Sequence, residues 1–396
     1  MKVLSVNAGS SSLKFQMYEM PEEKVLISGV FERIGLEKGM YTIKLNGEKI
    51  KKEKDLKDHS VAVQTLIDEL IENGIIKSLE EIEAVGHRLV HGGERYAKSV
   101  IIDDKVIKAV EELSDLAPLH NPANLIGVRT FMKLIPNAVQ VGCFDTAFHQ
   151  TMAPEAFLYP VPYEWYTKYG VRKYGFHGMS HNYIANRVNE LLGRTDTRVV
   201  SCHIGNGGSL CAIKDGKSFD TSMGFTPNAG LMMGSRSGGI DATLIPYVMK
   251  KTGESMEEVF NDLNKKSGYL GVSGISSDSR DIEEAIAEGD ERAILSQEIY
   301  VQKIVNYIAR YFVELNGLDA IVFTAGVGEN SPATRSAILD KLACLGVKYS
   351  QKENDCRGKE KLISTKDSKI KVYIIPTDEE VMIARDTYNL KTGKNK

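Results

Sequence analysis

The stretch VLSVNAGSSSLKF, residues 3–15, has the same form as VVSCHIGNGGSLCAI, residues 199–213. In both, an apolar run reaches a polar residue, turns through glycine, and continues as a second apolar run. Two such runs joined by a short Gly-rich turn predict an antiparallel hairpin. We therefore expect a duplicated architecture whose halves each present one hairpin to a common cleft, with two unrelated hairpins as the alternative.

The composition is that of a globular enzyme-sized chain. Its 396 residues suit two large domains. Hydrophobic residues make up 42% and charged residues 26%, which excludes a disordered chain. The net charge of −3 gives no general attraction to nucleic acid or to anionic lipid.

The cysteines and the hydropathy pattern indicate the cellular compartment. No pair stands as CxxC, and three of the five cysteines (Cys143, Cys202 and Cys211) lie in apolar runs, which predicts buried reduced thiols. No cysteine or histidine pair has the spacing of a metal site. No apolar run reaches the roughly 18 residues of a membrane span, and no signal peptide is recognisable. We expect a soluble cytoplasmic protein that binds neither nucleic acid nor membrane.

Strand-like and helix-like segments alternate along the chain, which is typical of the α/β class. Asn46-Gly47 predicts a hairpin turn, and Asp58 predicts the start of a helix that stops at Gly74. The run 281–315 predicts a helix broken at Gly289, and the charged segment 350–370 predicts an exposed loop. Further strands are expected at 82–90, 138–144, 319–324 and 371–377, and further helices at 104–115, 121–134, 179–192, 241–251, 255–265, 331–343 and 378–390.

Three Gly-rich turns follow predicted strands, at 7–12, 203–209 and 324–330. Glycine lets backbone amides approach an anion closely, and ligands of α/β proteins lie at the C-terminal ends of strands. Ser12 adds a hydroxyl donor and Lys14 a positive charge to the first turn. The P-loop and dinucleotide-binding patterns are both absent. Together the turns predict a site for nucleotide phosphates, although each alone could be an ordinary turn.

Four polar residues stand beside glycines or at predicted strand ends: Arg88, Asp145, His177 and Arg236. Phosphoryl transfer needs cations and donors around the transferred oxygens, and a carboxylate for a metal or a proton. Each residue alone could equally be a salt-bridge partner, a helix cap or a core histidine. As a set they favour phosphoryl transfer.

Eleven motifs, in the same order, resemble those of the acetate kinase family of the sugar-kinase and actin superfamily. They run from residue 7 to residue 380, so the resemblance covers nearly the whole chain. The motifs are NAGSSSLK, GHRLVHGG, PLHNPAN, FDTAFHQ, YGFHGMSH, HIGNGGS, DTSMGFTP, MMGSRSG, SSDSRD, TAGVGEN and PTDEE.

The resemblance implies two duplicated actin-like ATPase domains, of the ribonuclease-H-like type, flanking a nucleotide cleft. The N-terminal domain would comprise residues 1–147 plus 381–396, because the C-terminal helix returns to it. Residues 148–380 would form the C-terminal domain, which binds nucleotide and carries the contact of a homodimer.

The resemblance also implies a role for particular residues. Catalytic roles fall to Arg88, Asp145, His177 and Arg236, and the Mg²⁺ positions, where Mn²⁺ is a possible substitute, are Asn7 and Glu379. Acetate would contact Arg88 and an apolar pocket of Val90, Leu119, Phe176 and Pro227. The nucleotide would contact Ser12, Lys14, His203, Ile204, Gly205, Asn206, Gly207, Asp278, Ser279, Arg280, Gly326, Val327, Gly328, Glu329 and Asn330.

The implied reaction is reversible transfer of the ATP γ-phosphoryl group to acetate, giving acetyl phosphate and ADP. Acetate is already ionised at neutral pH, so we expect Asp145 to orient a metal-bound water or pair with an arginine rather than act as an obligatory base. A propionate or butyrate kinase is the nearest alternative, although Val90 should favour acetate. A nucleotide-switched actin-like binding protein is the alternative from another class.

The chain departs from the family pattern at a few positions. Gly239 replaces an acidic residue and Ala242 a proline near Arg236, and Ser279 stands where a larger, adenine-stacking residue is common. These changes bear on nucleotide affinity and base selectivity more than on the reaction.

Overall fold

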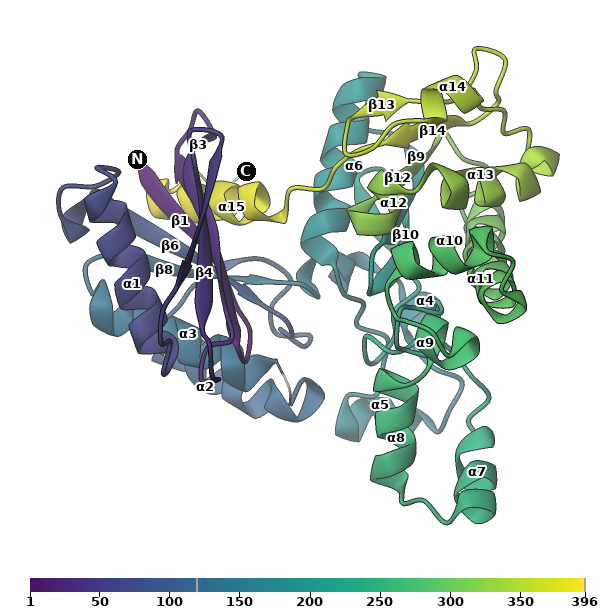
Figure 1. The fold of residues 1–396 in the computed structure, drawn as a ribbon, viewed down its shortest axis with the longest axis horizontal. Helices are drawn as coiled ribbons and strands as arrows, with labels where there is room; N and C mark the ends of the chain where they lie inside the picture. Colours follow the sequence, from purple (N-terminus) through teal and green to yellow (C-terminus); the bar gives the residue numbers. More distant parts are fainter. Residues whose placement is uncertain (119, 395–396) are drawn as a thin grey trace. The chain divides into compact units, whose positions relative to one another are not determined.

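The computed structural model describes residues 1–118 and 120–394. The chain forms two compact units, Met1–Phe148 with Asp378–Lys396, and His149–Thr377 (Figure 1). The last helix is thus part of the first unit, and Glu379 and Glu380 belong to that unit rather than to the second one. Within the described residues, no helix has both the length and the apolar character needed to cross a bilayer.

The first unit is built on a mixed sheet in the order β5-β4-β3-β2-β1-β6-β8-β7. The strands β1 to β5 form antiparallel hairpins, including the two predicted at Gly9 and at Asn46-Gly47, while β6 and β8 continue the sheet in parallel. The bounds are β1 (Lys2–Ala8), β2 (Ser12–Glu19), β3 (Lys24–Glu32), β4 (Met40–Leu45), β5 (Glu48–Glu53), β6 (Ile82–Leu89), β7 (Val100–Ile101) and β8 (Val139–Phe144).

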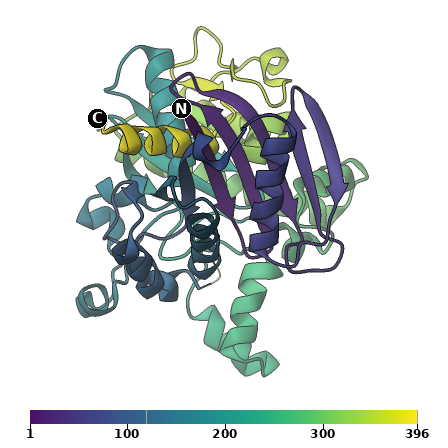
Figure 2. The ribbon, with the colours of Figure 1, turned by 90° about the vertical axis from the view of Figure 1, so that its left-hand side faces the viewer.

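Helices cover both faces of this sheet. Leu66 of α1 and Phe131 of α3 share a core with Phe15 of β2, and Figure 2 shows α1 lying over the strands. On the other face α15 packs so closely that a Cβ added at Gly86 would lie 2.5 Å from Ile383 Cγ2. The bounds are α1 (His59–Glu72), capped by Asp58 as predicted, α2 (Asp104–Glu112), α3 (Asn121–Leu134) and α15 (Glu379–Thr392).

The second unit is built on a sheet in the order β11-β10-β9-β12-β14-β13. Its strands are β9 (Arg198–Ile204), β10 (Gly208–Lys214), β11 (Lys217–Thr221), β12 (Ala320–Thr324), β13 (Lys361–Leu362) and β14 (Lys371–Ile374). Its helices are α4 (Pro154–Phe157), α5 (Tyr163–Tyr169), α6 (Gly178–Leu192), α7 (Leu244–Thr252), α8 (Met256–Lys265), α9 (Gly268–Ser273), α10 (Ser279–Ala287), α11 (Glu291–Glu314), α12 (Ala325–Asn330), α13 (Pro332–Lys341) and α14 (Gln351–Asn354).

The two sheets share one strand plan. In β3-β2-β1-β6-β8 and in β11-β10-β9-β12-β14, the first three strands are antiparallel and the last three are parallel. The hairpins β1–β2 and β9–β10 take the same place in each plan. The predicted duplication is confirmed, and the alternative of two unrelated hairpins is wrong.

Two predictions about local structure are wrong. Residues 325–330 form the helix α12 rather than a Gly-rich turn, because side chains within the segment satisfy its backbone: Glu329 Oε1 accepts from the Ala325 amide at 2.7 Å, and Asn330 Nδ2 donates to the Gly326 carbonyl at 2.9 Å. The segment 350–370 is not simply an exposed loop. It contains α14 and β13, and its apolar residue Ile363 is fully buried in the core.

Candidate functional site

In the first unit, Arg88 and Asp145 meet at the C-terminal ends of two neighbouring parallel strands. Arg88 lies in β6 opposite Cys143 of β8, and the Asp145 amide donates to the Leu89 carbonyl at 2.9 Å. The guanidinium donates twice to the carboxylate, from Nε to Oδ1 at 2.9 Å and from Nη2 to Oδ2 at 2.7 Å. This two-point pair fixes the plane of the guanidinium at the strand ends.

Burial makes this pair electrostatically sensitive. Removal from water raises the pKa of the Asp145 carboxyl, with the Arg88 charge acting in the opposite direction. Burial also opposes the charge on Arg88, but Asp145 and then Glu379 outweigh it, so the pKa of Arg88 is raised. Glu379, the first residue of α15, has Oε2 3.9 Å from Arg88 Nε. Arg88 therefore stays charged beside two carboxylates.

Two asparagines of α3 hold the backbone around this pair. Asn124 accepts from the Val90 amide at 3.1 Å and donates to the Ala8 carbonyl at 2.7 Å. Asn121 accepts from the His91 amide at 3.1 Å. These asparagines stand in the PLHNPAN motif, and no separate role for them is predicted from the sequence. They join the end of β1 to the segment after β6, while Leu119 lies outside the described residues.

The N-terminal hairpin carries the predicted metal and phosphate residues. Asn7 and Lys14 are register partners across β1 and β2, so their side chains lie on one face. Lys14 forms an ion pair with Glu380. Ser12 begins β2, and its carbonyl accepts from the Gly9 amide at 2.9 Å. Within the described residues, no three His, Cys, Asp or Glu side chains are grouped to hold a metal ion by themselves.

In the second unit, His177 occupies a strained position at the start of α6. Its φ of 55° is left-handed, which is uncommon for a residue other than glycine. The His177 ring stacks on His203 with centroids 4.0 Å apart, and its Nδ1 lies 2.9 Å from Ser209 Oγ. His181 Nε2 lies 2.8 Å from the same hydroxyl. The hairpin β9–β10 and the helix α6 together hold the His177 ring.

Arg236 lies beside His177 and the turn between β9 and β10. A Cβ added at Gly207 would lie 3.6 Å from Arg236 Nη1 and 4.0 Å from His177 Nε2, so glycine keeps this space open. The guanidinium is half-buried and donates to the Pro227 carbonyl at 3.4 Å. Among the described residues of the second unit, no carboxylate lies within 4.0 Å of it. Burial lowers the pKa of Arg236, which indicates a cation short of a negative partner.

A cavity of about 560 Å³ opens next to this turn, within the second unit. Eight residues predicted to bind nucleotide line it, whereas His203, Ile204, Gly207, Gly328 and Glu329 do not. Glu329 instead bonds backbone amides: its Oε1 accepts from Ala325 and from Thr377. The predicted residues that line the cavity are Gly205, Asn206, Asp278, Ser279, Arg280, Gly326, Val327 and Asn330.

Arg357 is a lining residue that the sequence did not reveal, because it lies in the segment taken for an exposed loop. It donates to the Asn330 carbonyl. The buried Arg335 fixes this segment by donating to Asn354 and to the carbonyls of Gly328 and Cys356. Gly234, Tyr269, Ser277, Glu283 and Ser331 also line the cavity and were not predicted.

Gly234 is a cavity residue that the sequence pattern could have indicated. A Cβ there would lie 1.8 Å from Asn206 Oδ1 and 2.6 Å from the Ser277 carbonyl oxygen. The glycine in MMGSRSG is therefore a close-approach residue for the cavity wall. The other missed residues carry no pattern that distinguishes them from surface positions.

The duplicated fold, with cations and glycine-rich strand ends beside a cavity of nucleotide size, defines the chain as a phosphotransferase of the kinase type. Comparison with known proteins narrows this class. The model of the acetokinase family matches residues 2–385. The acetate kinase of Bacillus cytotoxicus is 56% identical, with 98% of each chain covered.

Solved structures agree with the sequence comparison. The acetate kinase of Porphyromonas gingivalis superposes with a TM-score of 0.93 at 48% identity, covering 98% of this chain and 99% of that one. A propionate kinase from Francisella tularensis gives the same TM-score at 41% identity and the same coverage. The chain belongs to the acetokinase family.

Proposed function

We propose that this chain is an acetate kinase that transfers the γ-phosphoryl group of ATP, reversibly and in line, to acetate. The observation that carries the proposal is Arg236, a half-buried guanidinium beside His177 and Gly207 with no carboxylate partner in its unit. An anionic group in transfer would supply the missing negative charge. The charge that develops on the phosphoryl oxygens is stabilised by donors of this kind.

Phosphoryl transfer to acetate requires the two substrates to be positioned and does not require a strong base. Acetate is ionised at pH 7, so its oxygen is already a nucleophile. Asp145 is fully engaged by Arg88, which supports a role in holding that guanidinium over acetate rather than in proton transfer. His177 would donate to the moving phosphoryl group, since its Nδ1 is directed to Ser209.

We infer that Asn7 and Glu379 contribute to a Mg²⁺ site. Both offer oxygen ligands, and Mg²⁺ in kinases is commonly held by one or two carboxylates together with substrate phosphates. The charge of Glu379 also raises the pKa of Asp145, so a cation nearby would relieve this repulsion. When bound, the metal neutralises charge on the nucleotide phosphates.

The cavity of the second unit suits the nucleotide. Asp278 caps α10 and pairs with Arg280, whose guanidinium is otherwise exposed toward solvent. Gly205, Gly326 and Asn330 offer backbone and amide groups from two strand ends. The small Ser279 side chain leaves the base lightly contacted, so we expect modest selectivity among nucleoside triphosphates.

Acetate is proposed over propionate because Val90, which directly follows β6 and stands two residues after Arg88, carries a branched side chain. The family relatives include both acetate and propionate kinases of nearly equal structural similarity, so substrate size must be measured. Phe176 and Pro227 are proposed as further parts of the apolar pocket. Comparison of kcat/KM for acetate, propionate and butyrate with ATP and Mg²⁺ tests the assignment.

The reaction itself is tested by trapping acetyl phosphate with hydroxylamine. We expect hydroxamate to form only when ATP, Mg²⁺ and acetate are all present. ATP binding without hydroxamate would favour the alternative of a nucleotide-switched binding protein. Loss of product on omission of Mg²⁺, with recovery on addition of Mn²⁺, would support the metal assignment.

We further propose a cytoplasmic homodimer joined through the second unit. Large apolar side chains are exposed on α7 and α8, among them Leu244, Tyr247, Met256 and Phe260. All five cysteines are free thiols, which suits a reducing compartment. Light scattering at micromolar concentration should give twice the chain mass, and Tyr247→Glu with Phe260→Glu should give a monomer. A monomeric wild-type chain would contradict the proposal.

A further inference from the structure

The segment from Lys173 to Phe176 leads directly into His177, so its position decides where the His177 ring lies. The segment is not part of a helix or strand. His177 itself has a left-handed backbone, a strained conformation that persists in a residue other than glycine only where its surroundings enforce it. Something outside the segment must therefore fix it.

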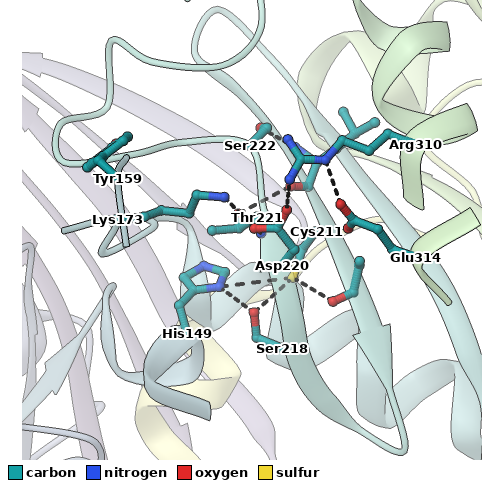
Figure 3. Close-up of polar contacts among 12 residues, drawn as sticks. His149, Tyr159, Lys173, Cys211, Ser218, Asp220, Thr221, Ser222, Arg310 and Glu314 are labelled. Atoms are coloured by element: carbon teal, nitrogen blue, oxygen red, sulfur yellow. Dashed lines mark hydrogen bonds and ion pairs between the residues drawn. The ribbon is translucent and has the colours of Figure 1, made fainter. Parts of the chain in front are cut away.

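The edge strand β11 supplies two buried side chains for this purpose. A β-bulge separates Ser218 from Asp220: Ser218 pairs with Ile213 and Asp220 with Ala212, which are neighbours in β10, so the two side chains lie on opposite faces of the sheet. Both are buried, whereas Phe219 between them is exposed. Figure 3 shows Ser218 beside His149 and Asp220 beside Lys173.

Ser218 acts through His149. His149 Nε2 lies 2.9 Å from the Phe176 carbonyl, and Nδ1 lies 2.8 Å from Ser218 Oγ. A carbonyl only accepts, so Nε2 carries the proton. Burial lowers the pKa of His149 to about 4, so the ring is neutral at pH 7 and Nδ1 accepts from the serine hydroxyl. The ring thus has one defined tautomer and orientation.

The same ring also contacts the segment directly. A Cβ added at Gly175 would lie 2.7 Å from the His149 ring and 2.5 Å from Thr221 Cγ2. Gly175, at a φ of +77°, is therefore in close contact with β11 and His149. The last two residues before His177 are held by packing as well as by a hydrogen bond.

Asp220 holds the start of the segment by its charge. One carboxylate oxygen accepts from Lys173 Nζ, and the other accepts from Arg310 Nη2 of α11 at 2.8 Å. Arg310 Nε also donates to Glu314 at 2.6 Å. The buried Asp220 carboxylate is thus paired with two cations, which is the usual condition for burying a charge. Figure 3 shows Asp220 lying between Lys173 and Arg310.

We propose that β11 positions His177 for catalysis, with Lys173–Asp220 fixing one end of the preceding segment and Ser218–His149 fixing the other. Lys173, Asp220, His149 and Ser218 are positioning residues that act only through His177. The inference rests on the proposed role of His177 in phosphoryl transfer. None of the four residues needs to touch substrate.

A double-mutant cycle with His177→Ala tests the proposal. Lys173→Met should lower kcat for acetate roughly tenfold while the KM for ATP changes less than about twofold, because small misplacements of a catalytic group are costly. In the His177→Ala background Lys173→Met should have no further effect on kcat, since its target is gone. Lys173→Arg, which retains the charge, should restore most of kcat.

Asp319→Asn is the matched control. Asp319 is a partly buried carboxylate that, like Asp220, is paired with two cations, here Arg194 and Arg198, but it precedes β12 and does not contact the segment. Its replacement should lower the melting temperature and leave kcat near wild type. If Lys173→Met does not fold, Ser218→Ala, which removes only a hydroxyl, should lower kcat about three- to tenfold with the same dependence on His177.

The measured kcat values distinguish failure of the positioning role from failure of the proposed role of His177. If the effects of Lys173→Met and His177→Ala multiply, or if Lys173→Met lowers only stability as Asp319→Asn does, the positioning role is overturned. If His177→Ala alone leaves kcat unchanged, the proposed role of His177 fails, whatever Lys173→Met does. A large kcat loss that disappears in the His177→Ala background supports the proposal.

Discussion

At the scale of single residues, Arg236 offers the sharpest test of the proposed site. A guanidinium can donate to two phosphoryl oxygens at once, and a lysine ammonium cannot reproduce that geometry. We expect Arg236→Lys to lower kcat about 10²–10³-fold, the scale observed when a preorganised donor is removed. Steady-state kinetics with saturating ATP and acetate would measure the loss.

The control for this substitution is Arg187→Lys in the same unit. Arg187 pairs with Glu190 and Glu360 at the surface, where ion pairs contribute little. It should keep kcat and melting temperature near wild type. Near wild-type kcat in Arg236→Lys would remove Arg236 from the transition-state contacts.

Val90 tests the proposed pocket for the acetate methyl group. Val90→Ala should shift the ratio of kcat/KM toward propionate roughly tenfold, because one methylene is worth about 1–3 kcal/mol in an apolar site. The backbone should stay in place, since its amide bonds to Asn124. Val100→Ala, the same truncation on the nearby strand β7, should leave the ratio unchanged, and an unchanged ratio in Val90→Ala would exclude Val90 from the pocket.

At the scale of helices and strands, the sequence predicts those elements whose backbone conformation is set by local patterns. The hairpins β1–β2 and β9–β10 and the helix α3 follow from hydrophobic periodicity and turn residues. The helix α12 could not be predicted from such patterns. Its glycines disfavour helix, and the hydrogen bond at its first residue depends on the side chain of Glu329. Arg357 was missed for a similar reason: its place at the cavity depends on Arg335, far along the chain, rather than on its neighbours.

Removal of Arg335 should therefore affect the elements that it joins, α12 and the segment that follows α14. It is fully buried, and its removal takes the guanidinium donor from the Asn354 side-chain oxygen and from the Gly328 and Cys356 carbonyls, while the Asn354 carbonyl keeps the Cys356 amide. Each unsatisfied buried group costs about 1–3 kcal/mol, so we expect Arg335→Met to destabilise the second unit by at least about 3 kcal/mol. The KM for ATP should also rise, because Arg357 and α12 line the cavity.

Calorimetry and ATP titration would separate these effects. Arg292→Met is the control, since Arg292 also donates to backbone carbonyls, at Val272 and Gly271, but is exposed. It should change stability by less than about 1 kcal/mol. An Arg335→Met chain with unchanged stability would show that the Asn354 side chain and the Gly328 and Cys356 carbonyls find other donors.

At the scale of the whole molecule, the two units repeat one strand plan but carry different functional side chains. The first unit presents Arg88, Asp145 and the hairpin residues Asn7 and Lys14, and the second presents His177, Arg236 and the cavity. Duplication is visible in the sequence because it shapes the backbone. The division of roles is not, because it depends on which side chains each copy acquired at equivalent strand ends, and family resemblance was needed to assign them.

Both units also bury neutral histidines, which makes the fold sensitive to mild acid. Burial lowers the pKa of His87, His91 and His149 to about 4 each, and lowers that of His181 well below its ordinary value. In the unfolded chain a histidine titrates near 6.5. Between these two values the unfolded chain binds more protons than the folded one, so stability must fall as the pH drops from 6.5 toward 4.

We therefore expect the free energy of unfolding to be flat from pH 8 to 7 and to fall by roughly 1 kcal/mol per buried histidine by pH 5.5. Carboxylates with lowered pKa values add their losses only below about pH 4.5. The raised pKa values of Asp145, Asp378 and Asp386 act in the opposite direction, so the window between pH 6.5 and 5 reports the histidines less the protons that these carboxylates take up. Urea unfolding across this range, resolved by unit where the transitions separate, would measure the slope.

His87→Gln is the control variant. It keeps an amide that can donate to Gln140, the partner of the His87 ring, and it should reduce the slope of the first unit by up to one proton without affecting the second. A slope that is the same in His87→Gln and in wild type would mean that the His87 ring takes up its proton in the folded chain as readily as in the unfolded one.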